Sequence, residues 1–323
     1  MRREAQLPTM STQEVSRREA WLMAARPQTL PAAAAPVIVG TGLALGAGAF
    51  APLPALAALV GALLIQVGTN FANDYYDAKS GVDSDDREGF TRVTQSGLIA
   101  PAEVRWAMIG TFGLSILVGT YLVWVGGLPI VVIGLASVAA GVLYAGGPYP
   151  LGSYGLGDLF VFVFFGLVAV TGTYYVQAAA AVSGVPLRPP PETLPLAAVV
   201  ASLPAAALST NILVVNNVRD LETDRAAGKR SLAVLIGYRW SRIEFLLLTG
   251  MAYIVPVIFW FTEYGPLVLA PLLTLPSAAR IARTVLNRTE GAALNPALER
   301  MGKLLAAHST LFAIGLALPG VLA

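Results

Sequence analysis

The stretch "PALAALVGALLIQVGTNFANDYYD", residues 54–77, reaches Asp74 without a single charged side chain and then ends in two aspartates. An uncharged, apolar run of about 20 residues is long enough for a helix to cross a lipid bilayer. In the whole 323-residue chain, 56% of the residues are hydrophobic and only 12% are charged, whereas soluble domains carry roughly 25% charged residues. The sequence therefore predicts an all-α integral membrane protein. It has no cysteine, which excludes disulfides and thiolate metal sites.

Segments without Asp, Glu, Lys or Arg cover residues 27–73, 106–157, 159–187 and 193–218. Glycine and proline divide the two longest of these segments, at residues 45–54 and 125–129, as is typical of a turn between helices at a membrane surface. We therefore predict a bundle of about nine transmembrane helices. The predicted helices cover residues 29–49, 54–73, 104–125, 128–145, 158–182, 194–217, 241–262, 264–285 and 303–322. Three prolines interrupt the eighth helix: Pro266, Pro271 and Pro276.

The basic residues indicate how the chain is oriented in the membrane. Twenty of the 21 Lys and Arg residues lie in the N-terminal tail or after predicted helices two, six and eight, and only Arg188 lies on the opposite side. Because short cytoplasmic segments are enriched in Lys and Arg, this face and the N-terminus are predicted to be cytoplasmic. We expect residues 1–25 to form a cytoplasmic tail and residues 26–323 to form one transmembrane domain.

Two acidic clusters of similar spacing follow predicted helices two and six. The first contains Asn73 and, four residues later, Asp77; the second contains Asn216, Asp220 and Asp224, again four residues apart. Four helices separate the two clusters, so both lie on the same side of the membrane. This arrangement predicts two repeats of parallel topology, related by an axis along the membrane normal.

The residue types in these clusters suit a metal ion and an anionic ligand. Residues four apart share a helix face, so each cluster forms one polar stripe, and two facing stripes form a pocket lined by carboxylates. Carboxylate and amide oxygens suit Mg²⁺, which usually keeps water and substrate phosphates as its other ligands. Basic side chains that can bind phosphate oxygens are interleaved with the acids: Lys79, Arg87, Arg92, Arg219, Arg225, Lys229 and Arg230. The alternative interpretation is a pair of solvated loops whose mixed charges provide solubility and topology.

These motifs on an apolar helical chain resemble the UbiA superfamily of intramembrane prenyltransferases, and the resemblance extends over nearly the whole sequence. Four stretches resemble more narrowly the superfamily's branch of 1,4-dihydroxy-2-naphthoate polyprenyltransferases. They are "RPQTLPAAAAPV" (26–37), "NDYYDAKSGVD" (73–83), "GGPYPLGSYGLGD" (146–158) and "NNVRDLETDRAAGKRSLA" (216–233). In the superfamily's first motif a further Asp follows Asp77 by four residues, but here that position is Gly81 and Asp83 comes two residues later. The shift is usual in the naphthoate branch, whereas Phe90 stands where we expect proline.

The resemblance implies a role for each of several residues. A magnesium ion bound to diphosphate would be held by Asn73, Asp77, Asp83, Asp220 and Asp224, with Asp74 and Asn216 as further candidates. Lys79, Arg92 and Lys229 would contact the diphosphate. Tyr154 corresponds to a region where related enzymes place a tyrosine near the reacting centre, although a tyrosine there can equally anchor the chain at the lipid headgroups. The aromatic run "FVFVFF" (160–165) can flank a cation or simply pack against lipid.

The implied reaction is the transfer of a polyprenyl group from polyprenyl diphosphate to 1,4-dihydroxy-2-naphthoate, with loss of diphosphate and carbon dioxide, giving demethylmenaquinol. Mg²⁺ is the expected cofactor, and the expected site faces the cytoplasm from the cell membrane. We expect these two substrates and the lipid bilayer as partners, with neither nucleic acid nor an obligate protein partner. Two alternatives are another aromatic acceptor (4-hydroxybenzoate, homogentisate or a chlorophyllide) and a transporter built from parallel repeats. A transporter normally has polar residues near the bilayer midplane, whereas these acids lie at helix ends.

Overall fold

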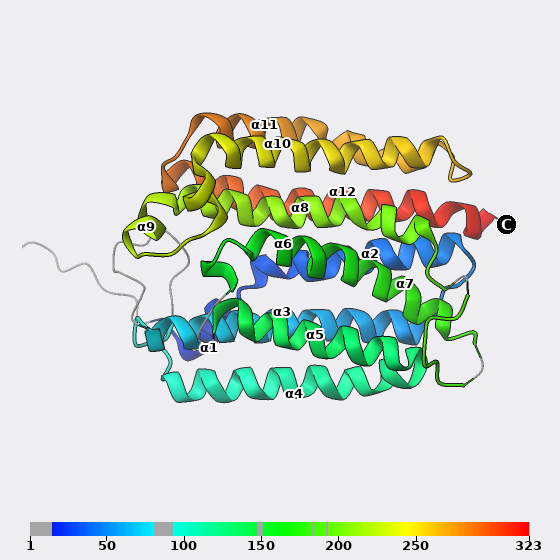
Figure 1. Cartoon of the computed structure of the whole chain (residues 1–323), viewed down its shortest axis with the longest axis horizontal. Coiled ribbons are helices and arrows are strands. Elements are labelled where there is room, and N and C mark those ends of the chain that lie inside the picture. Colours follow the sequence, from blue (N-terminus) through cyan, green and yellow to red (C-terminus); the bar gives the residue numbers. More distant parts are fainter. Residues whose placement is uncertain (1–14, 81–92, 147–150, 183, 192, 323) are drawn as a thin grey trace, which may run out of the picture.

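The computed structural model describes residues 15–80, 93–146, 151–182, 184–191 and 193–322, and the regular structure in these ranges is helical (Figure 1). The long helices are α2 (Leu30–Gly46), α3 (Pro52–Ser80), α4 (Pro101–Gly126), α5 (Leu128–Ala145), α8 (Leu196–Arg219), α10 (Leu232–Trp260), α11 (Leu275–Asn287) and α12 (Gly291–Leu322). The shorter ones are α1 (Arg17–Ala25), η1 (Pro27–Thr29), η2 (Leu151–Ser153), α6 (Gly157–Phe162), η3 (Val163–Val168), α7 (Ala169–Ala179), α9 (Leu221–Ala226) and η4 (Pro266–Thr274).

The predicted all-α membrane fold is confirmed. Seven helical segments of the described chain are long and apolar enough to cross a membrane, and α5 is a shorter apolar helix. Each of the nine predicted helices corresponds to one helical segment, with α6, η3 and α7 together forming the fifth and η4 with α11 forming the eighth. The eighth begins as a 3₁₀ helix that contains Pro271, because proline removes a backbone donor. The number of segments that cross the membrane stays a prediction.

Several helices extend beyond their predicted ends. Helix α3 continues to Ser80, α10 begins at Leu232 and α12 begins at Gly291. The predictions followed long apolar runs, whereas α3 continues into its acidic motif, α10 begins with a short apolar stretch before Gly237, and α12 begins with a mixed polar stretch. Within α10, Gly237 has φ 77° and ψ 170°, so the helix is interrupted there. Only glycine adopts this backbone geometry readily, and the kink separates the first turns from the apolar part.

The bundle has two halves with α2, α6 and α7 between them (Figure 1). Helices α3, α4 and α5 form one half, while α8, α10, α11 and α12 form the other. Helix α12 packs against both α2 and α8, and α4 packs against α3. Helices α3 and α8 both finish at the end of the bundle where α9 lies, so the two acidic motifs meet there.

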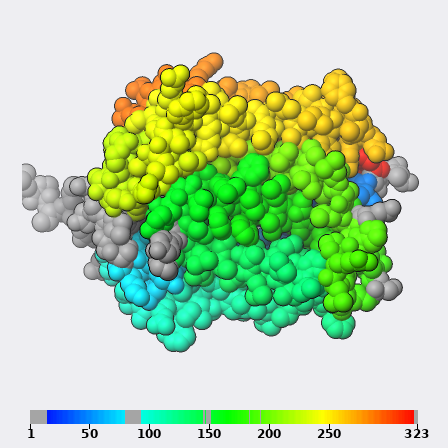
Figure 2. Space-filling model, in the orientation of Figure 1, coloured from blue at the N-terminus to red at the C-terminus, as the bar shows by residue number. Residues whose placement is uncertain are grey.

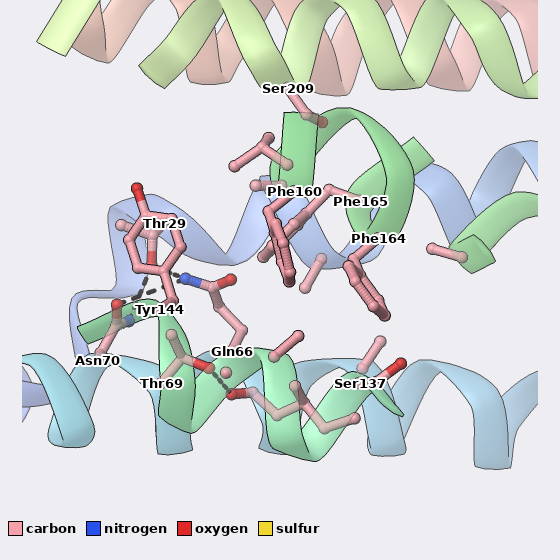
Figure 3. Close-up of a pocket in the computed structure, with 18 of the residues that line it drawn as sticks. Thr29, Gln66, Thr69, Asn70, Ser137, Tyr144, Phe160, Phe164, Phe165 and Ser209 are labelled. Atoms are coloured by element: carbon pink, nitrogen blue, oxygen red, sulfur yellow. Dashed lines mark hydrogen bonds between the residues drawn. The ribbon is translucent and has the colours of Figure 1, made fainter. Parts of the chain in front are cut away.

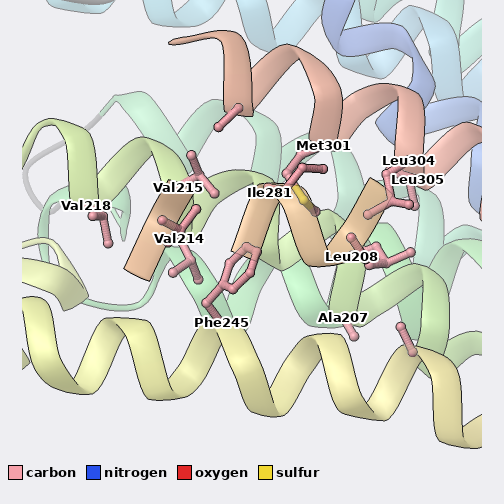
Figure 4. Close-up of a cluster of buried hydrophobic side chains, with 14 of the residues drawn as sticks. Ala207, Leu208, Val214, Val215, Val218, Phe245, Ile281, Met301, Leu304 and Leu305 are labelled. Atoms are coloured by element: carbon pink, nitrogen blue, oxygen red, sulfur yellow. The ribbon is translucent and has the colours of Figure 1, made fainter. Parts of the chain in front are cut away.

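The largest apolar core surrounds α8, the most buried of the candidate spans. Val214 and Val215 of α8 pack with Phe245 of α10, Ile281 of α11 and Met301 of α12 (Figure 4). This core fixes α8 as a rigid support for the residues at its end. On the opposite side of α8, the segment formed by α6, η3 and α7 lies across the middle of the molecule between α10 and α5 (Figure 2).

Candidate functional site

A cavity of about 1230 Å³ lies between the two halves of the bundle. Its polar end is formed by the ends of α3 and α8 and by the loop after α9. Residues with charged or hydrogen-bonding side chains line this end, among them Arg26, Asn73, Asp77, Tyr144, Asn216, Arg219, Asp220, Asp224 and Lys229. Towards the other end of the bundle the lining is formed mostly by apolar residues of α3, α4, α5 and α7. One cavity thus combines a charged end with a long apolar chamber.

Helix α3 presents a polar stripe to the cavity. Gln66, Asn70, Asn73 and Asp77 follow one another at intervals of four, three and four residues, and all four line the cavity. Asp74 lies on a different face of the helix: it is buried, forms an ion pair with Arg26, and its backbone carbonyl accepts a hydrogen bond from Thr94. Among the acids of the first motif that the structure describes, Asp77 therefore belongs to the cavity and Asp74 to the packing of the N-terminal segment.

The second motif also presents one face, although its helix is interrupted. Helix α8 ends at Arg219, and Asp220 has φ −91° and ψ 6°. The amide N–H of Asp224 nevertheless donates to the Asp220 carbonyl at 2.7 Å, so the helical register continues into α9. As a result Asn216, Asp220 and Asp224 all line the cavity, opposite the stripe of α3.

Arg219 organises the buried carboxylate of the second motif. Its Nε lies 2.7 Å from Asp220 Oδ1, and its Nη2 lies 2.7 Å from Asp220 Oδ2. The same guanidinium donates to Asn216 Oδ1 and to Asn295 Oδ1, each at 2.8 Å. Bidentate pairing of this kind fixes geometry as well as charge. The pairing holds the Asp220 carboxylate in place at a position where its side chain is only 4% exposed.

Lys229 is brought back to the cavity by the turn after α9. Its amide N–H donates to the Asp224 carbonyl at 2.9 Å, and its Nζ lies 3.7 Å from Asp224 Oδ1. The next residue, Arg230, donates its N–H to the Ser153 carbonyl at 3.0 Å, which attaches this turn to η2. The cavity's charged end thus contains Asp77, Asp220 and Asp224 together with Arg26, Arg219 and Lys229.

The donors present at this end suit Mg²⁺ as one part of a larger ligand. The Asp77, Asp220 and Asp224 carboxylates and the amides of Asn73 and Asn216 are among the hard oxygen donors here, and such donors are the ones that Mg²⁺ prefers. Among the described residues, however, no group of three acidic, His or Cys side chains is close enough to hold a metal ion by itself. Mg²⁺ usually retains water and takes phosphate oxygens from its substrate, so these side chains fit a metal that arrives with a phosphate ligand.

Other predicted site residues lie elsewhere. Lys79 is exposed at the end of α3, and Tyr154 is 46% exposed in the turn after η2. Neither belongs to the described residues that line the cavity. Asp83 and Arg92 lie outside the described residues, as does Phe90. The tyrosine that lines the cavity is Tyr144, at the end of α5, whose hydroxyl lies within electrostatic range of Asp77, Asp158 and Asp224.

Sequence reasoning missed a second polar group inside the cavity, formed by Thr29, Gln66 and Asn70 (Figure 3). The Gln66 amide donates to Thr29 Oγ1 at 3.0 Å, and the Asn70 amide donates to the same oxygen at 2.9 Å. Polar side chains within an apolar span are uncommon and usually functional, so Gln66 and Asn70 in the opening stretch were a usable signal. Tyr144 had no comparable signal, because a tyrosine at a helix end is usually an interface anchor.

An unusual helical segment carries the cavity's aromatic wall. Residues Val163–Val168 form a π-helix, a geometry that is rare and often found at functional sites. Phe160, Phe164 and Phe165 from this region line the cavity, and the first two rings stack at 5.5 Å with an interplanar angle of 25°. Gly166 permits the close approach to α8, since a Cβ at this position would lie 2.1 Å from the Cβ of Ala206.

The apolar part of the cavity extends to the surface of the bundle. Ile116 of α4 and Leu135 of α5 both line it, yet they are 51% and 61% exposed. An apolar residue with this exposure in a membrane-spanning helix contacts lipid. At these two residues the apolar part of the cavity reaches the accessible surface of the bundle.

Comparison with known proteins identifies close relatives over nearly the whole sequence. The model of the UbiA prenyltransferase family matches residues 33–299. A 1,4-dihydroxy-2-naphthoate octaprenyltransferase from Escherichia coli is 37% identical, and the alignment covers 95% of this chain and 98% of the relative. A 1,4-dihydroxy-2-naphthoate octaprenyltransferase from Mycobacterium tuberculosis is 38% identical, with 87% and 91% covered.

The fold is shared with a solved structure of low sequence identity. A UbiA homologue from Archaeoglobus fulgidus, whose structure was solved with GPP and Mg²⁺ bound, aligns with a TM-score of 0.60 and 18% identity. The alignment covers 91% of this chain and 99% of the homologue. At this identity the likeness establishes the common fold.

Proposed function

The chain belongs to the UbiA prenyltransferase family, and on that basis we propose that it transfers a polyprenyl group from polyprenyl diphosphate to 1,4-dihydroxy-2-naphthoate. Diphosphate and carbon dioxide are released, and the product is demethylmenaquinol. One observation carries the proposal: two Asn/Asp motifs meet at the charged end of a single cavity whose apolar part reaches the lipid-facing surface. A substrate with a diphosphate head and a long apolar tail matches both ends of this cavity.

Binding of the diphosphate head is assigned to the charged end. Asp77, Asp220 and Asp224, with Asn73 and Asn216, would hold Mg²⁺ there. When bound, Mg²⁺ acts as a Lewis acid that stabilises the negative charge of the leaving diphosphate. Arg219 and Lys229 donate hydrogen bonds to phosphate oxygens, which adds to this stabilisation. Of the other two predicted diphosphate contacts, Lys79 is exposed outside the cavity, so a contact from it would require movement, and Arg92 stays a prediction.

The rest of the cavity protects the reacting centre. Breaking the allylic C–O bond leaves positive charge on the prenyl carbon, which water would trap. The apolar walls exclude water, and the faces of Phe160 and Phe164 attract the cation. The ring carbon that bears the carboxylate then forms the new C–C bond, its bond to the carboxylate breaks, and the electron pair of that bond restores the aromatic ring as carbon dioxide leaves. Tyr144 lines the cavity and is proposed to contact the substrates, whereas a role for Tyr154 stays a prediction.

The charged end is proposed to face the cytoplasm, with the chain in the cell membrane. Helix α1, the end of α8 and the connection from α11 to α12 lie at this end and carry Arg17, Arg219 and Arg288, whereas Arg188 belongs to the connection between α7 and α8 at the other end (Figure 1). This distribution agrees with the excess of basic residues in cytoplasmic segments. Residues 26–323 are proposed to act as one domain. The helix α1 of the preceding tail packs against α3, since Ala20 and Ala24 join a core cluster with Phe71.

The decisive experiment supplies membranes containing the chain with a polyprenyl diphosphate, Mg²⁺ and either dihydroxynaphthoate or 4-hydroxybenzoate. We expect prenylated naphthoquinol and an equal amount of carbon dioxide from the first acceptor only. A chelator should stop the reaction, and added Mg²⁺ should restore it. Turnover of 4-hydroxybenzoate instead would overturn the assignment of dihydroxynaphthoate as the acceptor. Solute uptake by sealed vesicles with no prenylated product would support the transporter.

A further inference from the structure

The orientation of the Gln66 side chain is determined by its neighbours. Asn70 Nδ2 donates to the Ala25 carbonyl at 2.9 Å, which fixes the Asn70 amide, and Thr29 Oγ1 donates its proton to the Arg26 carbonyl at 2.9 Å. The Thr29 oxygen can therefore only accept from Gln66. Gln66 must turn its nitrogen towards Thr29 and Asn70, and its Oε1 points the other way.

This Oε1 atom is buried and lacks a partner. Gln66 is 7% exposed, and within the described part of the chain its Oε1 accepts no hydrogen bond. Gln66 lines the cavity, and in Figure 3 its oxygen lies on the side of the amide away from Thr29, the side on which Phe160 is drawn. Neighbouring atoms cover this oxygen, so a small movement of the side chain is needed to bring it into contact with a ligand. An unpaired carbonyl oxygen in an apolar environment is costly, so a ligand with a hydrogen-bond donor is strongly favoured here.

The chemistry of the two substrates decides which one can provide that donor. A polyprenyl diphosphate has an apolar tail and an ionised head whose oxygens are acceptors. A hydroxylated aromatic acid has ring O–H groups, and its flat ring matches the wall formed by Phe160 and Phe164. Gln66 and Asn70 of α3, with Thr29 of η1, are drawn on one side of the cavity, and Phe160 and Phe164 are drawn on the other side (Figure 3).

We propose that Gln66 recognises the aromatic acceptor: its Oε1 accepts a hydrogen bond from one ring hydroxyl while the ring lies against Phe160 and Phe164. This assignment rests on the proposed function and names the acceptor's place within that cavity. The hydrogen bond has two effects. It fixes the angle at which the ring meets the prenyl carbon, and it draws the hydroxyl proton towards Gln66, which raises the electron density of the attacking ring.

The test removes the Gln66 Oε1 atom and measures whether binding of the aromatic acceptor still depends on its ring hydroxyl. Gln66→Met keeps the length of the side chain without its polar atoms. Gln177→Met is a matched control, because Gln177 is 1% exposed and its Oε1 also lacks a partner among the described residues, but it does not line the cavity. Inhibition constants of 1-hydroxy-2-naphthoate and 4-hydroxy-2-naphthoate are measured against dihydroxynaphthoate in each variant, so that the reactivity of the analogues does not enter.

In the wild type, we expect the analogue that lacks the bonded hydroxyl to bind about tenfold more weakly than the other analogue, as one hydrogen bond predicts. In Gln66→Met this ratio should fall to about twofold or less, while the KM for polyprenyl diphosphate stays within about twofold. Gln177→Met should keep the wild-type ratio. Gln66→Glu retains an acceptor oxygen and should keep the ratio as well, even if all the anionic acceptors bind more weakly.

An unchanged ratio in Gln66→Met, or an equal loss in Gln177→Met, would overturn the assignment of Gln66. A wild-type enzyme that forms no product from dihydroxynaphthoate would instead overturn the proposed function, so the two failures are distinguishable.

Discussion

Arg219 and Asp220 are neighbours in the sequence, and their side chains form two parallel hydrogen bonds of 2.7 Å each at the end of α8. Both residues are buried and line the cavity. The carboxylate assigned to the metal site therefore carries its own counter-charge before any ligand binds. A diphosphate that enters with a divalent cation can take over the guanidinium, while the cation takes over the carboxylate. Each of the two charged side chains therefore has a partner both with and without bound ligand, so the charged end of the cavity stays folded in either state.

Replacing Arg219 should reveal the strength of this pairing. Arg219→Gln leaves the buried Asp220 without its bidentate partner, and losing one member of a buried pair costs about 3 kcal/mol or more. We expect a clearly lower unfolding temperature in detergent, measured by circular dichroism. Arg225→Gln is the matched control, because Arg225 pairs with Glu222 on the surface and such pairs contribute under about 1 kcal/mol. Equal shifts in both variants would contradict the structural role of Arg219.

Asp74 and Asp77 should give opposite phenotypes although three positions separate them. Asp77→Asn keeps the size of the side chain but removes a charge from the cavity, so prenyl transfer should fall by about 10²-fold or more with little loss of stability. Asp74→Asn weakens the buried ion pair with Arg26 and should mainly reduce stability, by about 3 kcal/mol. Turnover and thermal unfolding are measured on the same preparations. Full activity in Asp77→Asn would remove Asp77 from the site.

The positions of the acidic motifs were predictable because they depend on local periodicity. Asn73 with Asp77, and Asn216 with Asp220, obey the four-residue spacing of a helix face, and that spacing survives wherever a helix forms. Counting helices between the motifs was enough to place both at one end of the bundle. The kink at Asp220 was not visible in the sequence, but it leaves Asp224 on the same face.

The features that could not be predicted from the sequence depend on contacts between segments far apart in the chain. Arg26 pairs with Asp74 across 48 positions, and the Thr29 hydroxyl orients Gln66 across 37. No periodicity relates such residues. The π-helix that directs Phe164 into the cavity is likewise decided by packing, because Gly166 fits against Ala206 only after α8 is in place. Apolar composition also failed to locate the end of α3 and the beginnings of α10 and α12.

Gly166 should be sensitive to the smallest possible substitution. In Gly166→Ala, the new Cβ would lie 2.1 Å from the Cβ and 2.4 Å from the Cα of Ala206, so the π-helix must move away from α8. Overpacking of this kind costs about 1–3 kcal/mol, and the movement should also raise the KM for the aromatic acceptor. Gly113→Ala is the control, since a Cβ there meets nothing within 4 Å on an exposed face of α4. Comparable stability of the two variants would argue against close packing at Gly166.

Gly134 should control which prenyl chains the cavity accepts. It lines the apolar part of the cavity from α5, and a Cβ added there meets no other atom within 4 Å, so a larger side chain fits but occupies space. In Gly134→Leu, a long prenyl chain loses the burial of about two methylene groups, which corresponds to roughly tenfold in affinity. The ratio of kcat/KM for geranyl diphosphate to that for octaprenyl diphosphate should therefore rise about tenfold. Gly110→Leu, on an exposed face of α4 and outside the described lining, should leave the ratio unchanged. An unaltered ratio in Gly134→Leu would mean that the prenyl chain takes another path, because the leucine would then occupy space that the substrate never enters.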